Sequence, residues 1–259
     1  MEIIKKIEMK YNINKLENNI VNNVDYSKLV CHFHIDKKTE DFFFINKNLT
    51  STNQFLVNNV KINLIDNLLT KKEINELRRI QSINKKVPVG IDGFVKNYKL
   101  GDFIQSYRST IYSEHIANVI FQRIKHILSD IESPYHEKGN LFTPINVNPS
   151  MRFIEYNKNG QLIPHYDFPY VKNDKELTLL TLVIYLDTSK SGATRFIKEY
   201  RTNDYSDLKK IADTKDVLLS INPCSGNALL FQHQILHDSD VVLDKKLILR
   251  TDIIFKRVY

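Results

Sequence analysis

The stretch MRFIEYNKNGQLIPHYD, Met151–Asp167, decides how the rest of this chain is read. It ends in His165-Tyr166-Asp167. Residues two apart in a β-strand point to the same side, so the imidazole of His165 and the carboxylate of Asp167 are expected to project together. Such a pair supplies two of the three ligands of a 2-His-1-carboxylate site for Fe(II). The pair alone is a weak signal, because a surface histidine and aspartate at a strand end produce the same pattern.

A third donor and two cations follow downstream. The segment Gly226–Phe255, GNALLFQHQILHDSDVVLDKKLILRTDIIF, carries His237 and then, on a following strand, Lys246 and Arg250. At this point the chain resembles the Fe(II)- and 2-oxoglutarate-dependent dioxygenases, and within them the prolyl 4-hydroxylase-like branch. The resemblance covers about Phe55–Tyr259 and rests on several motifs in the family's order. Besides the H-x-D pair they are RFIEYNKNGQ (Arg152–Gln161), LTLVIYLD (Leu180–Asp187), SGATRF (Ser191–Phe196), PCSGNALLF (Pro223–Phe231) and His237.

The resemblance implies a metal centre formed by His165, Asp167 and His237, which would be both the catalytic and the metal-binding residues. It implies Fe(II), 2-oxoglutarate as co-substrate and dioxygen, and it admits ascorbate as well. His233 is the rival for the third ligand position, but His237 fits the family's H-x-G-x-x-V pattern better. Ser239 stands in place of the glycine of that pattern.

The far carboxylate of 2-oxoglutarate needs a buried cation, since an unpaired charge inside a protein is costly. Arg250 and Lys246 are the two candidates, and strand alternation places them on one face. Arg250 is preferred because its planar guanidinium matches a carboxylate. Lys246 stays open because its spacing from His237 is closer to that of prolyl hydroxylases. Tyr185 matches the family tyrosine that helps bind this carboxylate, and Tyr156 is expected in the same pocket; core packing is the alternative for both.

The order of elements predicts a mainly β fold with flanking helices and a double-stranded β-helix, or jelly roll, as its core. A capping box at Thr70–Glu73 opens a helix to about Gln81, and Ser113 opens a second, amphipathic helix to about Ile131. Phe55–Asp66 is expected as one strand. The later strands with a period of two are Arg152–Tyr156, Leu177–Leu186, Thr194–Ile197, Val217–Ile221, Ala228–Phe231, Val241–Leu243 and Leu247–Phe255.

Residues 1–54 are expected to form an N-terminal extension, and residues 55–259 the catalytic domain that the resemblance implies. Within the extension, Leu29–Asp36 and Asp41–Asn46 are joined by KKTE and predict a β-hairpin. His32 and His34 share a strand face there. No acidic or thiolate partner accompanies them, so they are assigned no metal.

Composition indicates one soluble domain: hydrophobic residues make up 42% and charged residues 26%. No apolar run reaches the length of a membrane span, so no membrane partner is expected. The first residues lack the apolar core of a secretory signal, and the 2 cysteines form no disulfide framework. The cytoplasm is therefore the expected compartment. The net charge of +7 comes from scattered lysines and is weak evidence for a nucleic-acid partner.

The leading hypothesis is hydroxylation of a peptidyl residue, with proline favoured, so a protein or peptide is the expected partner. A free amino acid or other small molecule, and alkylated nucleic acid, are the alternative substrates. A jelly-roll binding protein that has lost catalysis is the non-enzyme alternative, and the complete set of metal ligands argues against it. The substrate groove is expected among residues 85–101, 169–176 and 198–216. The sequence leaves the oligomeric state open.

Overall fold

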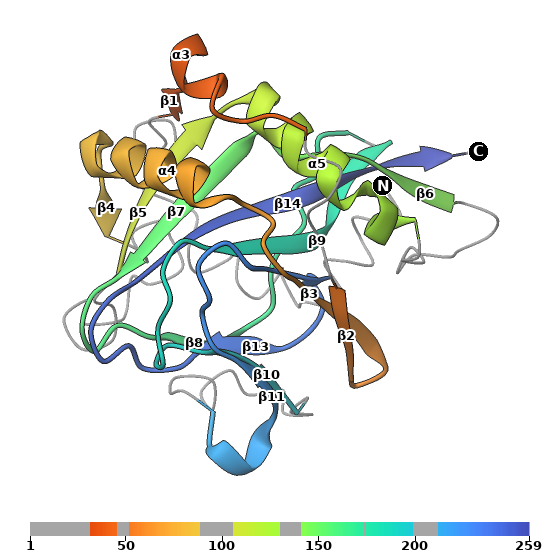
Figure 1. Cartoon of the computed structure of the whole chain (residues 1–259). Helices are drawn as coiled ribbons and strands as arrows, with labels where there is room; N and C mark the ends of the chain where they lie inside the picture. Colours follow the sequence, from red (N-terminus) through yellow and green to blue (C-terminus); the bar gives the residue numbers. More distant parts are fainter. Residues whose placement is uncertain are drawn as a thin grey trace, which may run out of the picture.

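The computed structural model describes residues 32–45, 52–88, 106–129, 141–173, 175–198 and 212–258. These residues form a ten-stranded and a four-stranded sheet, with helices on the outer face of the larger one (Figure 1). The larger sheet has the spatial order β1 (His32–His34), β5 (Ser106–Tyr112), β7 (Ser150–Tyr156), β14 (Lys246–Val258), β9 (Glu176–Tyr185), β12 (Ala228–Gln232), β3 (Val60–Ile65) and β2 (Thr52–Val57). Beside this path, β4 (Val87–Pro88) pairs with β5 and β6 (Leu141–Val147) pairs with β14. The smaller sheet has the order β11 (Val217–Ile221), β10 (Thr194–Ile197), β13 (His237–Ser239) and β8 (Leu162–His165).

The strands from β7 to β14 are distributed over the two sheets, as in a double-stranded β-helix. In the larger sheet they take the order β7-β14-β9-β12, and in the smaller sheet the order β11-β10-β13-β8. Every pairing within these two groups is antiparallel. The predicted mainly β jelly roll is confirmed.

Two longer helices, α4 (Lys71–Ile83) and α5 (Glu114–Leu128), cover the outer face of the larger sheet (Figure 1). The predicted capping box of α4 is present. The Thr70 hydroxyl accepts from the Glu73 N–H at 3.3 Å, and the Glu73 carboxylate accepts from the Thr70 N–H at 2.7 Å. Ser113 caps α5 as predicted. The predicted apolar stripes are buried: Ile74, Leu77 and Ile80 on α4, and Ile116, Val119, Ile120, Ile124, Ile127 and Leu128 on α5.

Replacing Thr70 by alanine is expected to lower the free energy of unfolding by about 1 kcal/mol, the usual cost of losing an N-cap side chain. Urea titration followed by circular dichroism measures it. The matched control is Lys71→Ala, because Lys71 is exposed in the next position of the same helix. Equal midpoints for the two variants would contradict a stabilising cap.

A buried ion pair joins the two helices. Arg123 of α5 donates from Nη2 to Glu73 Oε1 at 2.5 Å and from Nη1 to the Leu68 carbonyl at 2.8 Å. Both charged side chains are almost inaccessible, with exposed fractions of 0% and 1%. Glu73 therefore caps α4 and holds α5, a link that the sequence pattern did not reveal.

Strand alternation gives the larger sheet two different faces. Phe153 and Leu249 point to the helices and join the core beneath α4 and α5. Tyr156 and Ile248, on the same two strands, point to the smaller sheet and join a second core between the sheets. The second face carries the functional groups described below.

Four expectations about the elements are wrong. The hairpin in the N-terminal extension does not form, because KKTE is a helix, α3 (Lys37–Glu40), capped by Asp36. β1 instead pairs in parallel with β5, in the larger sheet. Phe55–Asp66 is not one strand, because Asn58 and Asn59 have positive φ angles of 49° and 61° and turn the chain between β2 and β3. Residues 241–243 are outside any strand, and β13 lies earlier, at His237–Ser239. The second helix ends at Leu128, short of Ile131.

The division of the chain into an extension of residues 1–54 and a domain of residues 55–259 stays a prediction.

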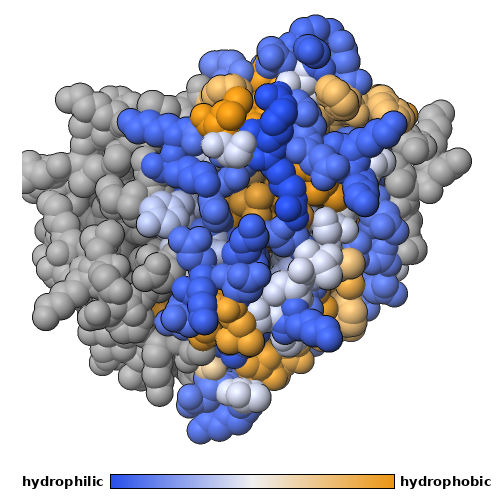
Figure 2. Space-filling view, turned by 60° about the vertical axis from the view of Figure 1, so that its left-hand side comes forward, coloured by the Kyte–Doolittle hydropathy of each residue, from blue (hydrophilic) through white to orange (hydrophobic). Residues whose placement is uncertain are grey.

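On the face seen in Figure 2, hydrophilic residues cover most of the coloured surface, and apolar residues lie between them in small groups. In the described ranges, the helices all fall short of the length and apolar character needed to cross a membrane.

Candidate metal centre

The side chains of His165, Asp167 and His237 converge between the sheets. Their ligand atoms all lie within 4.8 Å of one another. His165 is the last residue of β8 and His237 the first of β13, and the two are direct partners in the ladder that joins these strands. Asp167 follows just beyond the end of β8, so the pair does not share one strand as expected. The carboxylate still reaches the histidines, with Nε2–O distances of 3.8 Å to His165 and 3.6 Å to His237.

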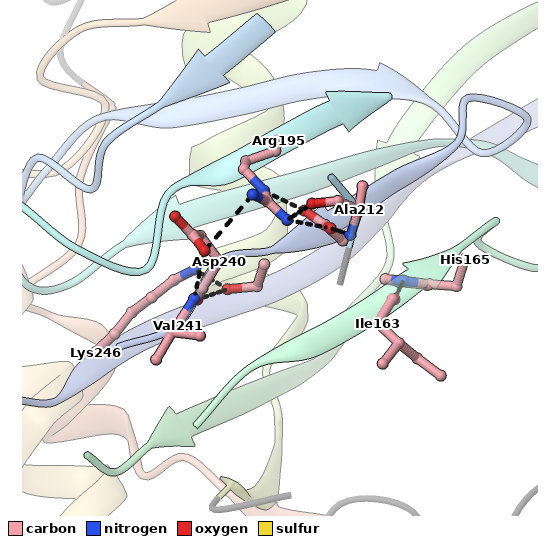
Figure 3. Close-up of polar contacts among 9 residues, drawn as sticks. Ile163, His165, Arg195, Ala212, Asp240, Val241 and Lys246 are labelled. Atoms are coloured by element: carbon pink, nitrogen blue, oxygen red, sulfur yellow. Dashed lines mark hydrogen bonds and ion pairs between the residues drawn. The ribbon is translucent and has the colours of Figure 1, made fainter. Parts of the chain in front are cut away.

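Backbone carbonyls fix the protonation of both rings. His165 Nδ1 lies 2.9 Å from the Ile163 carbonyl (Figure 3), and His237 Nδ1 lies 3.0 Å from the Ile235 carbonyl. A carbonyl oxygen only accepts hydrogen bonds, so each Nδ1 must carry the proton. Each Nε2 then presents a lone pair toward Asp167, which is the tautomer that a metal ligand requires. Burial, and then the neighbouring His165, lower the pKa of His237 to about 3, which keeps its ring neutral.

Asp167 is held as a carboxylate by groups on two strands. Arg250 Nη2 of β14 lies 2.8 Å from Oδ1, and the Thr181 hydroxyl of β9 donates to Oδ2 at 2.5 Å. Burial alone would raise the pKa of Asp167, but the charge of Arg250, and then His237, holds that pKa far below its ordinary value. The aspartate is therefore ionised and ready to bind a cation.

His233, the rival third ligand, is outside the cluster and supports Asp167 instead. Its ring is 2% exposed and lies between Thr181 and Thr178 of β9, with its Nδ1 2.9 Å from the Thr181 hydroxyl oxygen. Since Thr181 gives its own hydrogen to Asp167, His233 Nδ1 must donate to Thr181. The His233 carbonyl also accepts from the Asp167 N–H at 3.1 Å. His233 thus orients the carboxylate through two connections.

A second ion pair holds the strand of His237. Arg195 of β10 donates from Nε and Nη2 to the two oxygens of Asp238, at 2.8 and 2.6 Å. The same guanidinium donates to the Ala212 carbonyl and lies near Asp240 (Figure 3). Because Asp238 follows His237 in β13, this pair fixes the backbone that presents the ring.

A cavity of about 200 Å³ opens beside the cluster. Its floor is the inner face of the larger sheet, where Tyr156, Lys246, Ile248 and Arg250 point the same way, as alternation predicts. Its other lining residues come from both sheets and include Arg108, Arg152, Ile154, Leu162, Val183, Thr194, Asp238, Ser239 and the three clustered residues.

Lys246 lies at one end of this floor with its charge uncompensated. Its exposed fraction is 1%, and its Nζ donates to the Gly192 carbonyl at 2.6 Å and to the Ser239 hydroxyl at 2.8 Å. No carboxylate in the described ranges is within ion-pair distance of it. Burial lowers the pKa of Lys246 to about 7, although the charges of Asp238 and Asp240 oppose this shift.

Arg250 lies four residues beyond Lys246 on β14 and already has two anionic partners. Its Nη2 is 2.8 Å from Asp167 and 3.2 Å from Asp252. Burial alone would lower the pKa of Arg250, but Asp167 and then Asp252 raise it above its ordinary value. Its Nε–H is buried without an acceptor among the described residues.

The two tyrosines of the expected pocket differ in access. Tyr156 lines the cavity, and the Lys246 ammonium lies 4.9 Å from the centre of its ring. Tyr185 is fully buried, and its hydroxyl donates to Thr194 Oγ1 at 2.8 Å. Thr194 lines the cavity and keeps its own hydroxyl hydrogen to donate there. Tyr185 can therefore reach a ligand only through Thr194.

Sequence reasoning missed the residues that position the clustered side chains: Thr181, His233 and the Arg195–Asp238 pair. Thr181 lies inside an apolar strand, where it and Thr178 are the two threonines and the one signal that was available. Of the expected substrate groove, residues 89–101, 174 and 199–211 fall outside the described ranges.

Comparisons with known proteins give likenesses of fold at low identity. No protein-family model matches the chain, and no curated protein matches it. Among solved structures, the viral collagen prolyl hydroxylase of Paramecium Bursaria Chlorella virus-1 is 16% identical, covering 75% of this chain and 95% of its own, with a TM-score of 0.42. HygX from Streptomyces hygroscopicus, with nickel and 2-oxoglutarate bound, is 11% identical over 75% of this chain and 82% of its own, with a TM-score of 0.48. A prolyl hydroxylase from Trichoplax adhaerens, in complex with a hypoxia inducible factor peptide, is 14% identical over 74% and 82%, with a TM-score of 0.46.

Proposed function

We propose that this protein is an Fe(II)- and 2-oxoglutarate-dependent oxygenase, with His165, Asp167 and His237 as its metal ligands. The observation that carries the proposal is the converging cluster of two imidazole nitrogens and one carboxylate beside a cavity. This ligand set, with the remaining positions open, is typical of Fe(II) oxygenases.

The donor groups fit a divalent metal. Both histidines are held in the tautomer that presents Nε2, and Asp167 is ionised. The carboxylate is also supported by Arg250 and Thr181, as ligands in metal sites commonly are. Fe(II), when bound, would supply the redox and dioxygen chemistry.

For the far carboxylate of 2-oxoglutarate we propose Lys246 in preference to Arg250, which reverses the ranking from sequence. The support is electrostatic. A carboxylate arriving at Arg250 would compete with Asp167 and Asp252, whereas Lys246 contacts only neutral oxygens. A buried, uncompensated cation gains most from an anionic partner. Thr194 would add a hydroxyl donor at the same end, supported by Tyr185.

The other side chains would orient and shield the reactants. Tyr156 and Ile248 form the apolar floor between Lys246 and the metal ligands, and they exclude water from the co-substrate. The His233–Thr181 connection keeps Asp167 in one orientation.

For the substrate we propose a peptidyl residue, with proline as the first candidate. The support is the exposed segment that leaves Asp167, where the rings of Phe168 and Tyr170 are 43% and 53% exposed. Exposed aromatic rings that follow Asp167 in the chain offer stacking surfaces for an extended peptide.

Succinate formation tests the proposal. Iron-loaded protein is incubated with 2-oxoglutarate, with and without proline-containing peptides, and with free proline in a parallel arm. The expected result is peptide-stimulated succinate and a peptide that gains one oxygen by mass spectrometry. Turnover on free proline alone would exclude the peptidyl substrate but keep the oxygenase, and no succinate under any condition would exclude both.

The affinity for 2-oxoglutarate is expected to fall as pH rises above about 7, because burial lowers the pKa of Lys246 to about 7 and the neutral amine attracts no anion. Below that pH Lys246 is charged in the free protein, so affinity levels off. Calorimetric titration of the metal-loaded protein between pH 6 and about 9 measures the effect, which approaches tenfold per pH unit. Lys246→Arg is the control, since a guanidinium stays charged throughout and should remove the dependence.

A further inference from the structure

A second uncompensated cation lies at the opposite end of the cavity from Lys246. Arg152 of β7 lines the cavity and pairs in register with Arg250 of β14. Within the part of the chain that the structure describes, no hydrogen bond or ion pair engages its guanidinium. An arginine that borders a cavity without an acceptor is a binding group, since its planar fork matches carboxylates.

Positive charge accumulates around Arg152. Arg250 lies beside it on β14, and Arg108 of β5, which pairs with Ile154, lines the same cavity. The two carboxylates that act on the charge of Arg152 are Asp167 and Asp252, and both are engaged by Arg250. Burial, and then repulsion by the charge of Arg250, lower the pKa of Arg152, although the charge of Asp252 opposes this shift. An added anion would relieve that repulsion.

Lys246 and Arg152 lie far enough apart to bind two different molecules. Lys246 and Arg250 are four residues apart on β14, which is about 13 Å along a strand. Arg152 lies level with Arg250, the residue that contacts the metal ligand Asp167. A co-substrate bound at Lys246 would approach the metal from one end, and the Arg152 end would stay open for a second molecule.

We infer that Arg152 is a substrate-binding residue that takes a carboxylate of the molecule to be oxidised. The anion is the free acid group of an amino acid or the terminal carboxylate of a peptide. That this anion belongs to the substrate rests on the proposed function; the anion site itself does not. Arg250 has a supporting part, because its unused Nε–H lies in the same cluster.

Binding to metal-free protein tests the site directly. The probes are free L-amino acids, each against its own amide, and Gly-Pro against Gly-Pro-amide, followed by NMR titration at low salt. The expected result is at least one acid that binds about tenfold or more tightly than its amide, the usual range for a hydrogen bond to a charged group. The amino-acid and dipeptide arms distinguish the two sources of the carboxylate.

Matched variants locate the binding. Arg152→Met should lose the preference for the acid, and Arg152→Lys should keep part of it as a point charge. Lys246→Met should keep it, which separates this site from the co-substrate end. Lys158→Gln removes an exposed charge near the same strand and should change nothing. Equal binding of acids and amides, no binding of any acid, or an unchanged preference in Arg152→Met would overturn the inference.

Turnover then separates the two proposals. Acids that bind should stimulate succinate formation by iron-loaded protein more than their amides do. If acids bind through Arg152 and no succinate forms, the oxygenase fails while the anion site stands. If succinate forms and Arg152→Met discriminates acids from amides as the unchanged protein does, the anion site fails while the oxygenase stands.

Discussion

Replacing Asp167 by alanine is expected to abolish Fe(II) binding and all 2-oxoglutarate turnover. The carboxylate is the one anionic ligand of the cluster, and it is ionised by its contact with Arg250. Loss of a residue that hydrogen-bonds to a metal ligand commonly lowers metal affinity by roughly 10–100-fold, so loss of the ligand itself should lower it further. The variant would also leave Arg250 beside the two histidines with Asp252 alone to compensate its charge. Metal affinity is measured by equilibrium dialysis under anaerobic conditions, and turnover by succinate.

The control for this experiment is His126→Gln. His126 is exposed on α5, far from the cluster in sequence and on the helical layer of the fold. It should leave metal affinity unchanged, which would show that the loss of a histidine elsewhere in the protein has no effect on metal binding. An Asp167→Ala variant that binds one Fe(II) as tightly as the unchanged protein would show that the metal lies elsewhere.

Replacing Lys246 by methionine is expected to weaken 2-oxoglutarate binding by about 2–5 kcal/mol, which is roughly 30-fold or more, the cost of removing one partner of a buried charge pair. Methionine is close to lysine in length, so the cavity keeps its shape. Without ligand, the variant should be as stable as the unchanged protein or more stable, because a buried uncompensated charge is removed. Calorimetric titration of metal-loaded protein measures the affinity, and thermal unfolding measures the stability.

Arg250→Met is the matched comparison. Since Arg250 holds Asp167, its loss should reduce metal affinity by roughly 10–100-fold while affecting 2-oxoglutarate less than Lys246→Met does. The opposite ranking for 2-oxoglutarate would return the co-substrate carboxylate to Arg250, as the sequence alone suggested.

Local signals in the sequence predicted the parts of this fold that local interactions determine. The capping box at Thr70 and the periodic stripes of the two helices depend on neighbours a few residues away, and they are present. The hairpin predicted at residues 29–46 was wrong because a different local interaction determines the structure there. Asp36 accepts from the Thr39 N–H and opens a helix within KKTE, a cap that outweighs the alternation around it.

In the site, too, the sequence predicted what local motifs determine and missed what depends on partners distant in the chain. The three clustered residues were predicted because the H-x-D spacing and His237 lie within recognisable motifs. The choice between Lys246 and Arg250 could not be made from their own strand, since both point to one face. It depends on partners distant in sequence: Asp167 beside Arg250, and Gly192 beside Lys246. The support of Asp167 by His233 through Thr181 is a tertiary arrangement of the same kind.

The most direct test of the metal centre with its co-substrate needs no knowledge of the substrate. Under anaerobic conditions, 2-oxoglutarate is titrated calorimetrically into the protein with and without one equivalent of Fe(II), and the titration is repeated with Asp167→Ala. We expect one 2-oxoglutarate per chain, bound far more tightly with Fe(II) than without, and no gain in affinity from Fe(II) in the variant. Affinity that is independent of Fe(II), or a gain that survives in Asp167→Ala, would contradict it.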